Sequence, residues 1–222
     1  MTSEKIRQAV EVALDMQPIM QATFGDSKLY DLEPSVYPKG TQWYTTAGAN
    51  WYNVHNTDQA KQLAKEAGYS GQTIRWLTTQ DYDYMFKSTV VAVSQLQHAG
   101  FQVNMQVMDW ATLLDRRAKP AEWDIFVTSG VVVPDPSLLT VFSSTYPGWW
   151  DTPEKNALFA QFNSETDQAK RVQLWAKLQA MMYAEVPMIR PGGFYNLIIS
   201  RKGILGFKPS YIIIPWNVQA VG

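Results

Sequence analysis

The feature that most constrains the fold is a regular alternation of helical and strand periodicity between residues 57 and 130. Helices are predicted over residues 57–67, 81–99 and 111–118 from apolar side chains at helical spacing. Strands are predicted between and after them, over residues 73–79, 101–110 and 123–130. The third is continuously apolar, as expected of a strand covered on both faces. Helices that alternate with strands favour parallel pairing. We therefore predict an α/β fold with a mostly parallel sheet, built around residues 73–78, 102–108 and 124–129, and helices on both of its faces.

The flanking segments are less regular. Residues 3–14 have helical spacing with Ser3 as a cap, and further helices are predicted over 154–163 and 166–185. Residues 25–56 lack a clear period and read as a long loop with aromatic anchors, whereas 187–207 read as extended segments broken by Gly and Pro. The length of 222 residues permits one large domain, and we expect a single lobe over residues 1–222.

Composition excludes several classes of function. The net charge of −1 gives no sign of a nucleic-acid partner, and the absence of cysteine removes disulfides and thiolate chemistry. The two histidines, His55 and His98, have no metal-binding spacing, and neither a phosphate-binding loop nor a serine nucleophile motif occurs. Asp81 and Asp83 at a helix start are read as charges that complement the helix dipole. We therefore expect neither an enzyme nor a bound metal or cofactor.

Five segments of the chain, taken in order, resemble one protein family. They are IRQAVEVALDMQPIMQATFG (6–25), DQAKQLAKEAGYSG (58–71), HAGFQVNMQVMDWATLLDR (98–116), WDIFVTSGVVVPDPSLLTVFSS (123–144) and TDQAKRVQLWAKLQAMMYAEVPMIRP (166–191). Together they resemble the C-terminal lobe of extracytoplasmic solute-binding proteins of the oligopeptide, dipeptide and nickel class, family 5, which serve ABC importers. The resemblance implies a type II periplasmic-binding-protein-like lobe that lies outside the cytoplasm. The N-terminal residues lack the apolar core of a signal peptide, and members of the family have a first lobe that this chain lacks.

The resemblance also draws attention to residues 131–136, Val-Val-Val-Pro-Asp-Pro. Peptide-binding members of the family have here an aspartate that pairs with the α-amino group of the peptide. Counting back from Asp135 places that position at Val132, and counting forward from Asp124 places it at Val133. An amine buried without a counter-ion is costly, so a sugar, an opine-like compound, a capped or hydrophobic peptide or another amphipathic solute becomes more credible. The Pro-Asp-Pro is read as a turn that begins the next helix, with Asp135 or Ser137 as its cap.

The candidate solute contacts lie at or near the carboxyl ends of the second and third strands, where open α/β sheets bind ligands. They are Trp110, Thr128, Ser129, Gly130, Val131, Val132, Val133 and Trp149, with the tryptophans as possible stacking faces. Arg116 and Arg117 are read as a solvated helix face, and Asp109 as a helix cap.

The leading interpretation is the substrate-binding component of an ABC importer, which captures a peptide-like or other small amphipathic solute between two lobes and delivers it to the permease. Its expected partners are that solute, the missing N-terminal lobe and the permease subunits. Two alternatives stay open: a ligand-sensing domain of a transcriptional regulator, and an enzyme domain.

Overall fold

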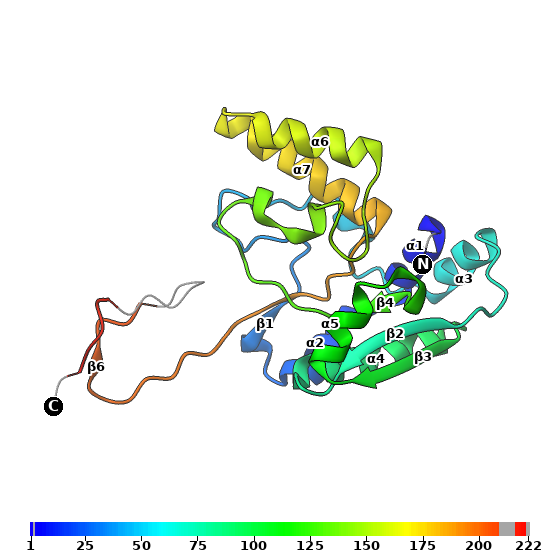
Figure 1. Cartoon of the computed structure of the whole chain (residues 1–222), viewed down its shortest axis with the longest axis horizontal. Coiled ribbons are helices and arrows are strands. Elements are labelled where there is room, and N and C mark those ends of the chain that lie inside the picture. Colours follow the sequence, from blue (N-terminus) through cyan, green and yellow to red (C-terminus); the bar gives the residue numbers. More distant parts are fainter. Residues whose placement is uncertain (2, 209–215, 221–222) are drawn as a thin grey trace.

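A three-stranded parallel sheet lies at the centre of the larger part of the molecule. The computed structural model describes residues 1, 3–208 and 216–220. Strand β2 (Ile74–Thr79) is flanked by β3 (Val103–Met108) and β4 (Ile125–Phe126) in the order β3-β2-β4. Helices α4 (Asp83–His98) and α5 (Trp110–Arg117) make the two crossovers between these strands (Figure 1). The predicted α/β architecture with a parallel sheet is confirmed.

Successive side chains of β2 point to opposite faces of the sheet, and helices cover both faces. Ile74 and Trp76 belong to a core shared with α1 (Glu4–Ala13), α3 (Thr57–Glu66) and α4. Leu77 points the other way, into a small cluster with Leu113 of α5. The prediction of helices on both faces is therefore correct.

The predicted strand over residues 123–130 is much shorter in the structure. β4 pairs with β2 at only two positions, Trp76 with Ile125 and Leu77 with Phe126. The last backbone bond to β2 is donated by Val127 to Leu77, and residues 128–132 are exposed. The valine run thus lies in a loop, since Pro134 and Pro136, which follow it, have no N–H to donate to a sheet.

A second, more aromatic core lies between the helix pair α6 (Pro153–Ser164) and α7 (Gln168–Glu185) and the long loop predicted over residues 25–56. Trp175 of α7 donates its indole N–H to the Trp43 carbonyl at 2.7 Å. Gln179 donates to the carbonyls of Thr45 and Ala47, each at 2.9 Å. The loop therefore has a fixed path along α7, although it contains only short elements: η1 (Ser27–Leu29), β1 (Tyr30–Asp31) and η2 (Ala49–Trp51).

The remaining elements join these parts or leave them. Helix α2 (Met16–Phe24) packs on α4, and short 3-10 turns η3 (Pro120–Glu122), η4 (Pro136–Leu138) and η5 (Thr140–Phe142) lie in the connections. β5 (Gly193–Phe194) pairs antiparallel with β1, and β6 (Ile204–Leu205) pairs with β7 (Gln219–Ala220). No helix of the described residues is long and apolar enough to span a bilayer.

Beyond β5 the chain leaves the body of the molecule as an extended arm, drawn in orange to red in Figure 1. We refer to residues 195–208 as the arm. Leu197 is 70% exposed and Ile199 is 91% exposed. Extended segments were predicted here, but these apolar residues have no packing partner in the part of the chain that the structure describes.

Glu11 provides a test of the packing between α1 and the rest of the lobe. Its carboxyl is buried without a hydrogen-bond partner among the described residues, and burial raises its pKa to about 8. Because this pKa is higher in the folded than in the unfolded chain, stability should fall as pH rises from about 4.5 to 8. Glu11→Gln cannot ionise, so its stability should decline much less over this pH range. Its melting temperature should be higher than that of the wild type at pH 8 but not at pH 5. Melting curves with the same pH dependence in both proteins would contradict this.

Candidate functional site

The carboxyl ends of the three parallel strands meet at one edge of the sheet, and their loops are hydrogen-bonded to one another. After β2, the Asp81 carboxylate accepts a hydrogen bond from the backbone N–H of Trp110, which follows β3, at 2.7 Å. After β4, the Ser129 hydroxyl lies 2.9 Å from the Tyr84 hydroxyl, which belongs to the first turn of α4. The three loops therefore form one continuous surface, which we call the carboxyl-edge surface.

Most of the predicted solute contacts lie on this surface. Thr128, Ser129 and Gly130 are exposed, as are Val131 (66%) and Val132 (44%). Trp110 is half-buried at the start of α5. The valines at 131 and 132 thus offer an apolar surface to the outside and do not belong to the sheet core.

Two predicted residues are placed differently. Val133 is half-buried and packs against the second core. The ring of Trp149 stacks on Trp123, with the centroids 5.8 Å apart. Trp123 precedes β4, so this aromatic contact is not with the loop after β4. Trp110 is therefore linked to the loop after β2, through Asp81 and Tyr82, whereas the ring contact of Trp149 is with Trp123.

Sequence reasoning missed a row of aromatic rings along the same edge. Trp110 meets Tyr82 edge-on at 5.3 Å, Tyr82 lies 5.9 Å from Tyr84, and Tyr84 lies 5.6 Å from Phe194. We call Trp110, Tyr82, Tyr84 and Phe194 the aromatic row. The two tyrosines in QDYDYMF (80–86), directly after a strand, were a usable signal. Phe194 had none, because its position depends on the pairing of β5 with β1.

The Pro-Asp-Pro corner has a structural role. The Asp135 carboxylate accepts from the backbone N–H of Ser137 at 3.0 Å, which confirms Asp135 as the cap, although the element it begins is the 3-10 turn η4. Both carboxylate oxygens also accept from Arg171 of α7, at 2.9 and 2.8 Å. Burial alone would raise the pKa of Asp135, but the bonds from Ser137 and the charge of Arg171 hold that pKa below its ordinary value.

The other charged residues near this edge also have local partners. Asp109 caps α5 by accepting from the backbone N–H of Thr112, as predicted. Asp83 lies in the first turn of α4 and pairs with Lys87 at 2.6 Å. The reading of Arg116 and Arg117 as a solvated face is wrong. Arg116 is half-buried and pairs with Glu122 at 2.8 Å, and the Arg117 guanidinium lies over the ring of Phe126 at 5.8 Å. Within the described residues, no group of three His, Asp or Glu side chains is arranged to hold a metal ion.

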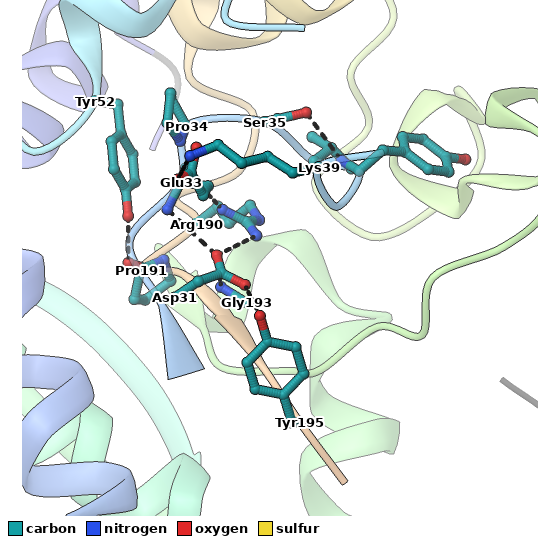
Figure 2. A network of polar contacts seen from close by, with 12 residues as sticks. Asp31, Glu33, Pro34, Ser35, Lys39, Tyr52, Arg190, Pro191, Gly193 and Tyr195 are labelled. Carbon is teal, nitrogen blue, oxygen red and sulfur yellow. Dashed lines mark hydrogen bonds and ion pairs between the residues drawn. The ribbon is translucent and has the colours of Figure 1, made fainter. Parts of the chain in front are cut away.

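A polar network holds the point where the arm leaves the lobe (Figure 2). Asp31 of β1 accepts hydrogen bonds from the Gly193 backbone and from the Tyr195 hydroxyl, both at 3.3 Å, and lies 3.8 Å from Arg190. Tyr52 donates to the Pro191 carbonyl at 2.8 Å. These contacts fix β5, and with it Phe194, beside the aromatic row.

The glycines at 192 and 193 allow this close approach. A Cβ on Gly192 would collide with the backbone carbonyl of Asp31, and one on Gly193 would lie 2.6 Å from the Asp31 carboxylate. Backbone atoms cannot move aside as a flexible side chain can. Gly192 is therefore required by packing.

Gly192→Ala should lower the free energy of unfolding by about 1–3 kcal/mol, as for other overpacked sites. Gly130→Ala is the matched control, because a Cβ there would meet nothing within 4 Å, and its stability should stay close to that of the wild type. Urea unfolding of the three proteins measures the difference. Equal losses of unfolding free energy in the two variants would show that the chain at Gly192 is not tightly packed against β1.

Comparison with known proteins places this geometry in a family. The model of bacterial extracellular solute-binding proteins, family 5, middle region, matches residues 1–151. A probable peptide ABC transporter periplasmic-binding protein of Sinorhizobium fredii is 26% identical over 98% of this chain and 43% of its own length. A probable deoxycholate-binding periplasmic protein of Escherichia coli is 26% identical over 92% of this chain and 39% of its own.

The solved structures agree with the fold. The murein tripeptide binding protein of Escherichia coli superimposes with a TM-score of 0.82 at 20% identity, over 99% of this chain and 45% of that one. The fold is thus that of a type II periplasmic-binding-protein lobe. The chain spans less than half the length of the curated relatives it matches. With the family model matching 151 of its 222 residues, the chain belongs to the bacterial extracellular solute-binding proteins, family 5.

Proposed function

We propose that this chain is one lobe of the substrate-binding component of an ABC importer, and that it holds the solute on the carboxyl-edge surface. The observation that carries the proposal is the linkage of three strand-end loops into one exposed surface that combines hydroxyl groups with apolar side chains. Such edges are where open α/β sheets bind ligands. The solute would contact Trp110, Thr128, Ser129, Gly130, Val131 and Val132, with Val133 behind them in the wall.

A second lobe would complete the site. The arm carries apolar side chains that are exposed in this chain, and a surface of that kind is normally covered by a partner. The relatives are more than twice as long as the part of them that this chain matches, and the remaining length is enough to form a second lobe. The solute would then be enclosed between the two lobes, which close about it.

The role is capture and delivery, without chemistry. Near the carboxyl-edge surface, the described carboxylates have local protein partners, and no nucleophile with an adjacent base is among the described residues there. The complete protein would act outside the cytoplasm, where relatives are described as periplasmic, and would hand its solute to the permease subunits. The relatives named as peptide-binding and deoxycholate-binding leave the identity of the solute to experiment.

The test of this function uses the complete protein with both lobes, purified without denaturation. Native mass spectrometry should show a bound small molecule, and small-angle scattering should show a smaller radius of gyration with the solute than without it. A protein that carries no solute and does not close, or one that converts the solute to a product, would contradict the proposal.

The exposed valine at 132 allows a direct change of selectivity. Val132→Asp places a carboxylate on the carboxyl-edge surface, so affinity for peptides with a free amino group should rise and affinity for the native solute should fall. Isothermal titration of the complete protein with both kinds of ligand measures this.

Val133→Asp is the companion variant. Its side chain is half-buried against the second core, so this variant should also lose stability, whereas Val132→Asp should not. If neither variant alters the choice between ligands, the valines do not contact the solute.

A further inference from the structure

We propose that the aromatic row is a platform for an apolar solute without a free amino group, and that Tyr82 is its principal solute-contacting ring. This inference rests on the proposed function and names the class of solute that the same surface takes. Three kinds of observation support it: the geometry of the row, the position of Tyr82 in its helix, and the charges around it.

The four rings give the sheet edge a long aromatic border. They come from three separate parts of the chain, α4, α5 and β5, and consecutive centroids lie 5.3, 5.9 and 5.6 Å apart. Behind Phe194 the ring of Phe24 stacks at 5.0 Å, which supports that end of the row from the body of the lobe. Tyr82, in the middle, remains 39% exposed. A solute lying along this edge would meet ring faces and edges over its length, which favours an apolar or planar body.

Tyr82 occupies a helix-capping position in which tyrosine does not supply the cap. It is the N-cap residue of α4, with extended backbone angles, and its side chain makes no capping hydrogen bond. The other six α-helices of the described residues are capped by the side chains of Ser3, Asp15, Asn56, Asp109, Thr152 and Asp167. A Ser, Asp or Asn cap stabilises a helix relative to a residue that cannot accept the bond. The longest of the helices around the sheet therefore lacks this stabilisation and has an exposed ring in its place.

The carboxylates that flank the row are already engaged by the protein. Asp81 accepts from the Trp110 backbone, and Asp83 pairs with Lys87. At the far end of the row, Asp31 accepts from Gly193 and Tyr195 and lies near Arg190. Asp109 accepts from both the backbone and the hydroxyl of Thr112.

An ammonium group on the solute would therefore have to compete with these donors, and it would meet valine at 131 and 132. Burying it there without a dedicated counter-ion is unfavourable. A neutral or capped end would meet the Ser129 hydroxyl and the valine side chains at no such cost. The surface thus selects against a free amine and in favour of rings and aliphatic groups.

The decisive variant is Tyr82→Ser in the complete protein. Serine can supply the missing cap, which offsets the loss of the ring contacts with Trp110 and Tyr84, so the melting temperature should stay close to that of the wild type. Affinity for an aromatic probe should fall about tenfold with the loss of one ring contact. Tyr82→Phe is the matched control: it keeps the ring, loses only the hydroxyl, and should bind the probe as the wild type does. A fall in affinity without a fall in stability cannot be ascribed to misfolding.

The probes are N-acetyl-Phe-Leu-Phe, the same tripeptide with a free amino group, and N-acetyl-Ala-Ala-Ala, each titrated by calorimetry. We expect the acetylated aromatic peptide to bind most tightly, and only its affinity to depend strongly on the ring at position 82. Equal or tighter binding of the free-amine peptide, equal binding of the alanine peptide, or unchanged affinity in Tyr82→Ser would overturn the inference. So would failure of all three probes to bind; the proposed function would then still be judged separately, by whether a co-purified solute and lobe closure are found.

Discussion

The ion pair between Asp135 and Arg171, in which one guanidinium nitrogen donates to both carboxylate oxygens, fixes the relation between the sheet and the helix pair α6–α7, and the candidate site depends on that relation. Arg171 also lies 4.3 Å from the centroid of the Phe162 ring, so its charge is held by an aromatic face as well as by the carboxylate. The neighbouring Pro134 carbonyl accepts the indole N–H of Trp43 at 2.9 Å. Charge-assisted bonds in a half-buried setting are among the stronger polar contacts in proteins. The loop after β4 is thus held at both ends, by β2 on one side and by this corner on the other.

That arrangement explains why the local elements of the fold could be predicted from the sequence, whereas the site could be predicted only in part. Helices such as those capped by Ser3 and Asp109 depend on contacts within a few residues, and their periodicity is visible in the sequence. The position of the Pro-Asp-Pro corner depends on Arg171, thirty-six residues beyond Asp135, which no local pattern reveals. In the same way, Phe194 reaches the aromatic row only because Gly192 allows β5 to approach β1. Trp110 and residues 128–132 follow their own strands and were predicted at this edge, whereas Tyr82 and Tyr84 were overlooked although they directly follow β2. Phe194 is brought in by distant pairing and could not be predicted.

The high aromatic content also becomes intelligible in physical terms. Several indoles act as structural donors: Trp43 to Pro134, Trp175 to Trp43, Trp123 to Arg117 and Trp150 to Glu185. Each one fills core volume and at the same time satisfies a backbone carbonyl or a carboxylate. Trp43, Trp150 and Trp175 belong to the second core, and Trp123 belongs to the small cluster with Leu77 and Leu113. The rings that remain available at the sheet edge are chiefly tyrosines, together with Trp110.

The same logic connects the valine loop to the rest of the edge. A site that recognises an ammonium group needs a carboxylate whose oxygens are not already used as acceptors by the protein. Here the flanking aspartates cap a helix, join two loops, or hold β5 against β1. Converting one of them to ligand binding would remove a structural contact. Val131 and Val132, by contrast, are exposed and have apolar side chains, which satisfy no polar group of the protein. We therefore expect a change of side chain at Val131 or Val132 to leave the contacts that hold the edge together intact, whereas a change at one of the aspartates would remove such a contact.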